Sequence, residues 1–206
     1  RADDAYAGSQ SFERLKKAVE DVLGKNYLLP VHQGRAAENI ICHTFVKPGS
    51  VIPTNYHFTT TLAHIMENGG VIEELLYDHA LEIKSSHPFK GNMNIEKLVE
   101  CIERHGAEKI PFIRMEASTN LIGGQPFSIA NMMDVRRIAD KYGIMLVLDA
   151  SLLGENAYLV KQREDAWKEN SMADIIKMMT NLADLVYFSA RKLSSSRGGG
   201  ICTNRK

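Results

Sequence analysis

The sequence predicts an α/β fold, a three-layer arrangement in which a mostly parallel sheet is flanked by helices. Two observations lead to this prediction. Short apolar runs of strand length alternate along the chain with segments whose apolar residues recur at helical spacing. The strand-length runs are apolar throughout, which is typical of strands covered by helices on both faces.

The first half of the chain begins this alternation. Apolar residues from Phe12 to Leu23 recur at helical spacing, and Gly24 follows as a stop signal. A short apolar run then precedes a turn at residues 33–35. In order, the elements expected in this half are a helix over 12–23, a strand over 27–31, a helix over 36–45, a strand over 71–76 and a surface excursion over 81–92.

The second half of the chain alternates more regularly. In order, the expected elements are a helix over 95–102, a strand over 110–113, a helix over 129–142, a strand over 144–148, a helix over 172–182 and a strand over 185–188. The chain shows no internal repeat, low-complexity tract or linker. We therefore expect residues 1–206 to form a single domain.

Bulk composition disfavours several classes of protein. The chain has 25 basic and 25 acidic residues, so no net charge draws it to nucleic acid or to an anionic membrane. Cys42, Cys101 and Cys202 form no CxxC pair, which favours reduced thiols in a cytoplasmic protein. The sequence has no apolar stretch of membrane-spanning length and no signal-peptide core. Because it lacks an initiator Met, we expect trimmed ends.

Polar residues follow the predicted strands at the points where the strands end. Ligands of open α/β sheets bind beyond the carboxyl ends of the strands, so these residues are the candidates for a site. They are Gln33, Gly34 and Arg35 after the first strand, Asn120 after the strand at 110–113, Asp149 after the next, and Ser189 and Lys192 after the last. We expect them to converge on one crevice.

Three of these positions suit a particular chemistry. Lys192 lies just past a buried strand, where desolvation and neighbouring cations favour a nucleophilic amine, although a surface lysine in a basic loop gives the same pattern. Asp149 ends an apolar strand, a position that suits a carboxylate paired with a pyridinium nitrogen. An aspartate that only caps a helix or lies in a loop would give the same sequence pattern. The turn at 33–35 precedes a predicted helix whose first backbone N–H groups can hold a phosphate. The alternative is that these residues only form a turn.

Five motifs together resemble one family. They are residues 31–39 (VHQGRAAEN), 56–61 (YHFTTT), 120–126 (NLIGGQP), 155–158 (ENAY) and 189–192 (SARK). Their order and spacing are similar to those of the β-eliminating lyases, the family of tyrosine phenol-lyase and tryptophanase, and the likeness extends from Asp4 to Gly200. The resemblance implies the large domain of an aspartate-aminotransferase-type, or fold type I, pyridoxal phosphate enzyme, with the small domain outside this chain.

The resemblance also implies a role for each candidate residue. Lys192 would hold pyridoxal 5′-phosphate as a Schiff base. The other cofactor-binding residues would be Gln33, Gly34, Arg35 and Ser189 at the phosphate, Phe58 stacked on the ring, Asn120 at its phenolic oxygen and Asp149 at its nitrogen. Thr59 would lie near the substrate. Tyr6 would act as a general acid in a neighbouring subunit's site, which implies a homodimer or homotetramer.

The reaction implied by the resemblance is carbon–carbon cleavage by β-elimination. Lys192 would remove the α-proton of a tyrosine-type or tryptophan-type amino acid, and Tyr6 would protonate the aromatic side chain. Phenol or indole would then leave, and pyruvate and ammonia would remain.

Two residues depart from the family pattern. Leu152 stands where the family has an arginine for the cofactor's phenolic oxygen, and leucine cannot replace a cationic donor. Arg197 stands where the family has an asparagine that helps to bind potassium, and a guanidinium repels a cation, so we expect no metal ion. The departures leave two alternatives open: a degenerate, non-catalytic relative, and a β-eliminating lyase with a different amino-acid substrate.

Two further enzyme classes are disfavoured. A dinucleotide-binding fold requires GxGxxG after the first strand, and the glycines at 198–200 come too late. The seven histidines show no HExxH or comparable spacing for a hydrolytic metal site.

Overall fold

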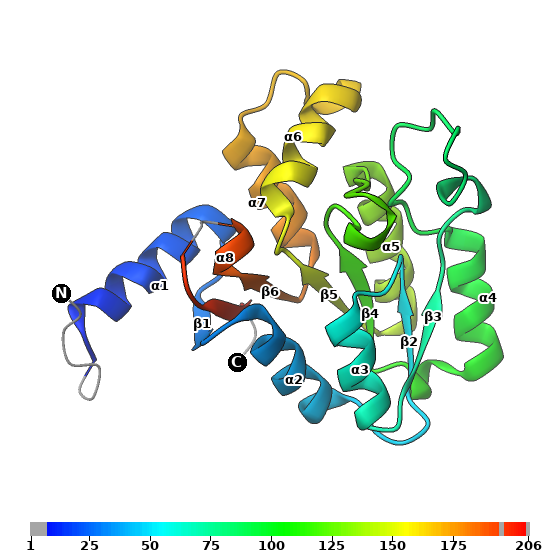
Figure 1. The fold of residues 1–206 in the computed structure, drawn as a ribbon, viewed down its shortest axis with the longest axis horizontal. Helices are drawn as coiled ribbons and strands as arrows, with labels where there is room; N and C mark the ends of the chain where they lie inside the picture. Colours follow the sequence, from blue (N-terminus) through cyan, green and yellow to red (C-terminus); the bar gives the residue numbers. More distant parts are fainter. Residues whose placement is uncertain (1–7, 194–195, 205–206) are drawn as a thin grey trace.

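The computed structural model describes residues 8–193 and 196–204, and its centre is a seven-stranded sheet (Figure 1). The strand order is β1-β7-β6-β5-β4-β2-β3. The strands are β1 (Tyr27–Val31), β2 (Val51–Thr54), β3 (Val71–Glu74), β4 (Phe112–Glu116), β5 (Met145–Asp149), β6 (Leu185–Ser189) and β7 (Gly199–Thr203). Strands β2 to β6 pair in parallel, and β7 is antiparallel to both β1 and β6. The prediction of a mostly parallel sheet is confirmed.

Helices cover both faces of this sheet. They are α1 (Gln10–Leu23), α2 (Gly34–Phe45), α3 (Thr59–Glu67), α4 (Ile95–His105), α5 (Ile129–Tyr142), α6 (Leu153–Arg163), α7 (Met172–Leu182) and the short α8 (Ala190–Leu193). Helices α1 and α4 to α7 contribute to the larger core, and α2 and α3 to a smaller one. In the described part of the chain, no helix is both long and apolar enough to cross a membrane.

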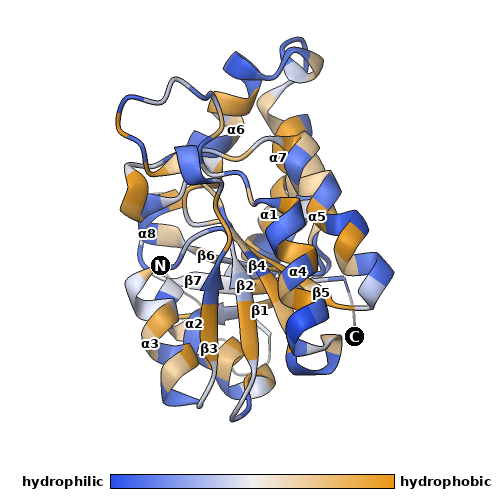
Figure 2. Ribbon diagram, turned by 90° about the vertical axis from the view of Figure 1, so that its right-hand side faces the viewer, coloured by the Kyte–Doolittle hydropathy of each residue, from blue (hydrophilic) through white to orange (hydrophobic). Residues whose placement is uncertain are grey.

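Strand β5 shows why both faces need a helical layer. Leu146 and Leu148 are buried in the larger core, whereas Val147 between them is buried in the smaller one. Successive side chains of a strand point to opposite faces, so a strand that is apolar at every position must be covered twice. Figure 2 shows the hydrophobic residues along the strands and on the flanking helices.

Side-chain caps begin α1, α4, α5 and α7, whereas α2, α3 and α6 lack them. The side chains of Ser9, Asn94 and Ser128 accept hydrogen bonds from the first-turn backbone of α1, α4 and α5. By contrast, Gln33 before α2 and Phe58 before α3 make no side-chain cap bond. The amino ends of α2 and α3 therefore keep backbone donors that a side chain would otherwise occupy.

The sequence located most elements and missed five. The expected bounds 27–31, 129–142 and 172–182 are confirmed to the residue. Strands β2 and β7 and helices α3, α6 and α8 were not expected. Strand β2 has four residues and contains Pro53, and β7 begins with two glycines, so both lack the usual strand signal. Helix α3 opens with three threonines, which favour helices weakly.

Candidate active site

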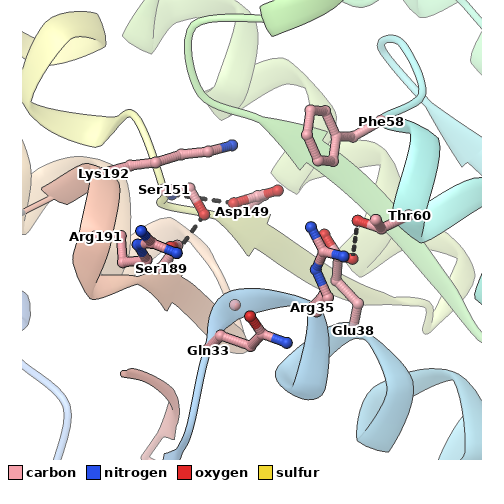
Figure 3. A pocket seen from close by; sticks show the side chains of 11 residues that line it. Gln33, Arg35, Glu38, Phe58, Thr60, Asp149, Ser151, Ser189, Arg191 and Lys192 are labelled. Carbon is pink, nitrogen blue, oxygen red and sulfur yellow. Dashed lines mark hydrogen bonds between the residues drawn. The ribbon is translucent and has the colours of Figure 1, made fainter. Parts of the chain in front are cut away.

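A cavity of about 280 Å³ lies at the carboxyl ends of β1, β5 and β6. Its lining residues are Gln33, Gly34, Arg35, Glu38, Phe58, Thr60, Asp149, Ser151, Ser189, Arg191 and Lys192 (Figure 3). This set contains every residue that the sequence predicts to bind the cofactor except Asn120. The candidates converge because β1, β5 and β6 point the same way, so their carboxyl ends share one edge of the sheet.

The amino end of α2 forms one wall of the cavity. The first N–H groups of a helix have no acceptor within the helix and carry partial positive charge. Gly34 lets this end approach β6 closely, because a Cβ atom on Gly34 would lie 2.8 Å from the Cβ of Ser189. Arg35 and Arg191 add two guanidinium groups to the same lining. This wall suits an anion such as a phosphate.

Lys192 and Phe58 lie across the cavity from each other. The Nζ atom of Lys192 is 4.3 Å from the centroid of the Phe58 ring, and the lysine side chain points across the cavity towards that ring (Figure 3). The desolvated setting expected for Lys192 is wrong for this chain, because its side chain is exposed on the short helix α8 beyond the sheet edge. The expected neighbouring cations are present as Arg35 and Arg191.

Asp149 is anchored from three directions. Its Oδ2 atom accepts hydrogen bonds from Arg114 Nη2 at 2.8 Å and from the hydroxyl of Tyr187 at 2.9 Å. Its Oδ1 atom accepts the backbone N–H of Ser151 at 3.0 Å. The Ser151 hydroxyl in turn accepts the backbone N–H of Ser189 at 3.1 Å, which ties β5 to β6. The carboxylate therefore has one set orientation at the cavity wall.

Arg114 lies at the centre of a buried charged network. It is 1% exposed, its Nη1 and Nη2 atoms both lie 3.1 Å from Glu116 Oε2, and its Nε donates to the Tyr187 hydroxyl at 3.0 Å. Burial alone would lower the pKa of Arg114, but Tyr187, Glu116 and Asp149 raise it well above its usual value. Burial raises the pKa of Glu116 and of Tyr187, and the guanidinium opposes both shifts.

Glu38 adds an acidic group to the cavity lining. The Thr60 hydroxyl donates to Glu38 Oε2 at 2.5 Å (Figure 3). Burial and the nearby charge of Asp149 raise the pKa of Glu38, and the hydrogen bond from Thr60 opposes that shift. Glu38 therefore holds a proton more readily than an ordinary glutamate.

Of this network the sequence pointed to Asp149 but not to Arg114 or Glu116, because these two residues lie inside β4 and not after it. Arg114 and Glu116 are two residues apart in β4, an otherwise apolar strand. A spacing of two places both side chains on one face of a sheet. Two opposite charges at that spacing in a buried strand are the signal that could have revealed them.

Three predicted residues are not among the described lining of the cavity. Asn120 begins the 3₁₀ turn η3 (Asn120–Ile122) and is exposed, and its backbone N–H donates to Glu116 Oε1 at 3.0 Å. Thr59 is exposed at the start of α3, beside the lining residue Thr60. Tyr6 lies outside the described residues.

The two residues that depart from the family pattern differ in their exposure. Leu152, which directly precedes α6, is half-buried, and Arg197 is exposed.

One group of metal-binding residue types lies away from the cavity. Ligand atoms of Glu73, Cys101 and His105 are all within 4.8 Å of one another. Arg104 Nη2 forms an ion pair with Glu73 at 2.5 Å, and His105 also pairs with Glu73. We interpret this group as an ion-pair cluster, because a guanidinium at the same carboxylate repels a cation.

Comparisons with known proteins agree with the fold. The family model described as beta-eliminating lyase matches residues 1–206. The tyrosine phenol-lyase of Symbiobacterium thermophilum is 43% identical over 190 residues, which are 92% of this chain and 42% of that protein. The tyrosine phenol-lyase of Pasteurella multocida is 41% identical over 203 residues, or 98% of this chain and 44% of that protein.

A solved structure extends the likeness to the fold. It is a DegT DnrJ EryC1 StrS aminotransferase from Brucella abortus, and it matches with a TM-score of 0.62 at 16% identity over 96% of this chain and 47% of that one. The mostly parallel sheet with helices on both faces is thus the fold of fold type I pyridoxal phosphate enzymes. Within that class, the chain belongs to the β-eliminating lyase family. It spans less than half the length of these curated relatives.

Proposed function

We propose that residues 1–206 are the cofactor-binding large domain of a pyridoxal-phosphate-dependent lyase that performs β-elimination on an aromatic amino acid. The observation that carries this proposal is the meeting of Lys192, Asp149 and the amino end of α2 around one cavity. Pyridoxal 5′-phosphate is the cofactor of the family and fold class. An amine, a carboxylate and an anion-binding helix end are the groups that its aldehyde, ring nitrogen and phosphate require.

The residues of the cavity fit this cofactor. Gln33, Gly34, Arg35 and Ser189 would hold the phosphate, since the close packing of α2 on β6 leaves backbone donors and a guanidinium at that wall. Phe58 would stack on the ring, and Asp149 would bond the ring nitrogen. When bound, the cofactor supplies an electron sink for the carbanion that forms at the substrate α-carbon.

The proton transfers are assigned to side chains of this chain. The Lys192 amine would remove the α-proton, which its exposed position at the cavity allows. Tyr6 would protonate the departing ring from a neighbouring subunit, with Thr59 and Asn120 completing the substrate and cofactor contacts. The products would be phenol or indole, pyruvate and ammonia, and the assembly would be a homodimer or homotetramer.

Leu152 supports a second candidate, a relative that has lost this reaction or acts on another amino acid. Leu152 directly precedes α6, and it is not among the residues that line the described cavity. A leucine there supplies no cation to the phenolic oxygen of the cofactor.

An absorbance measurement tests the proposed function. The purified full-length protein is mixed with pyridoxal 5′-phosphate, and its visible band is recorded before and after borohydride. We expect a band that borohydride bleaches, with the cofactor then fixed on the peptide that contains Lys192. Lys192→Ala should lose the band, and Lys109→Ala, at an exposed lysine away from the cavity, should keep it. A wild-type protein without the band contradicts cofactor binding.

Substrate assays separate the two candidates. Release of pyruvate from tyrosine or tryptophan by the cofactor-loaded protein supports aromatic β-elimination. Pyruvate from a different amino acid supports the changed substrate, and no pyruvate from any of them supports the degenerate relative.

A further inference from the structure

Arg114 is a buried cation that touches the cavity only through other residues. It is 1% exposed in the middle of β4 and does not belong to the described cavity lining. Its Nη2 atom nevertheless donates to the Asp149 carboxylate at 2.8 Å. A buried charge is costly unless it is paired, and Asp149 is one of the groups that pair with Arg114. Because Arg114 does not line the cavity, its influence on the cavity passes through Asp149.

The face of the sheet brings these partners together. Glu116, Asp149 and Tyr187 are register neighbours on β4, β5 and β6. Arg114 is two residues before Glu116, so it shares the same face, towards α2 and α3. Asp149 is the residue of this group that lines the cavity.

The two carboxylates bonded to Arg114 have different surroundings. Glu116 Oε2 accepts both terminal nitrogens of Arg114, and its Oε1 accepts the backbone N–H of Asn120 at 3.0 Å. Asp149 shares one oxygen between Arg114 and Tyr187 and faces the cavity. One guanidinium thus lies between two acidic side chains, and a protonated ring nitrogen in the cavity would place a second cation beside Asp149.

We propose that Arg114 is a positioning residue that keeps the Asp149 carboxylate charged and oriented towards the cofactor ring nitrogen, with Glu116 as the structural counter-ion of Arg114. The proposal rests on the proposed function, because it requires the cofactor in this cavity. The guanidinium attracts the negative charge of the carboxylate, so a proton shared between Asp149 and the ring stays on the nitrogen. A protonated ring is the stronger electron sink.

Nitrogen NMR of the loaded protein tests this role without an activity assay. The full-length protein is loaded with pyridoxal 5′-phosphate that carries ¹⁵N in its ring, and the chemical shift of that nitrogen reports its protonation at neutral pH. Arg114→Met alone leaves two buried carboxylates unpaired and can fail to fold. The double variant Arg114→Met with Glu116→Gln removes both charges together and keeps the test open.

The variants have opposite expected results. In the wild-type protein and in Glu116→Gln, the ring nitrogen should show the protonated shift, because Arg114 remains beside Asp149. In the double variant the shift should move towards the unprotonated value. Arg114→Lys, which keeps a cation at this position, should restore the protonated shift.

The outcomes separate this inference from the proposed function. A wild-type protein that binds no cofactor contradicts the proposed function. Cofactor-loaded variants that all keep the wild-type shift show that Arg114 is merely structural and overturn the inference alone. An unprotonated ring nitrogen in the loaded wild-type protein overturns it as well.

Discussion

The Nζ atom of Lys192 lies 4.3 Å from the centroid of the Phe58 ring, although the two residues are 134 positions apart in the sequence. The contact joins the short helix α8, which follows β6, to the start of α3, and both residues line the cavity. It places the Lys192 amine beside an aromatic surface. The proposed cofactor, which is flat and carries an aldehyde, would stack and react in the same place.

Phe58→Leu should weaken cofactor binding without removing the covalent link. Loss of an aromatic stacking surface corresponds to about 1 kcal/mol, or roughly a fivefold rise in the dissociation constant of pyridoxal phosphate. Fluorescence titration of the cofactor-free protein measures this change. An unchanged dissociation constant would show that the ring does not stack on Phe58.

Gly34→Ala should disturb the contact between α2 and β6. The added Cβ atom would lie 2.8 Å from the Cβ and 3.2 Å from the Cα of Ser189, so the helix end must shift. We expect a loss of unfolding free energy of about 1–3 kcal/mol and weaker cofactor binding. Urea unfolding and the same titration measure both effects.

Gly154→Ala is the matched control for that substitution. Gly154 lies in α6, and a Cβ atom there would meet no described atom within 4 Å. Alanine is the better helix former, so stability should rise by up to about 1 kcal/mol and cofactor binding should not change. Equal losses in the two variants would argue against a specific packing role for Gly34.

Glu38 should make stability fall as pH rises. Its pKa is raised in the folded protein by burial and by Asp149, above its ordinary value of 4.5. Its contribution to the unfolding free energy is therefore fully present below pH 4.5 and is lost as pH rises through the higher folded value. In Glu38→Gln this part of the decline should disappear, as measured by urea unfolding of the cofactor-free protein over a pH series.

An exposed glutamate provides the comparison for the pH series. Glu100 lies on the exposed side of α4, and Glu100→Gln should follow the wild-type pH profile. If Glu38→Gln follows it too, Glu38 is not the group that titrates.

Asn156→Ala should be strongly destabilising. The Asn156 side chain is fully buried, accepts the backbone N–H groups of Ser118 and Phe127, and donates to the carbonyl of Phe127. Alanine would leave these backbone groups without this partner, at a cost of about 3 kcal/mol or more. A loss below about 1 kcal/mol in urea unfolding would mean that water replaces the side chain.

The three cysteines should be unreactive in the folded protein. Burial raises the pKa of Cys42, Cys101 and Cys202 to about 12 in each case, so thiolate is scarce at pH 8. A chromogenic disulfide reagent should detect all three thiols only after unfolding in urea. A rapid reaction of one thiol in the native protein would contradict the burial seen here.

Local patterns in the sequence predicted much of the candidate site, because an apolar run marks a single strand and the polar residue after it marks the end of that strand. Asp149 and Ser189 follow apolar runs, and the carboxyl ends of parallel strands share an edge. Their meeting with the turn at Gln33 is therefore predictable in outline. Strand β7 was not predicted, and its insertion between β1 and β6 depends on pairing between Val31 and Gly199 that no local pattern encodes.

Stretches of contiguous residues were sufficient to predict the alternation of strands and helices, the family, and the polar residues that end β5 and β6, because periodicity and motifs are local properties. Only the folded chain shows that Arg114 bonds Asp149 across 35 positions and that Glu38 meets Thr60 at the cavity. The exposure of Lys192 is likewise a result of folding. These features depend on which strands become neighbours and on how much water their packing excludes, and both are set by the whole chain at once.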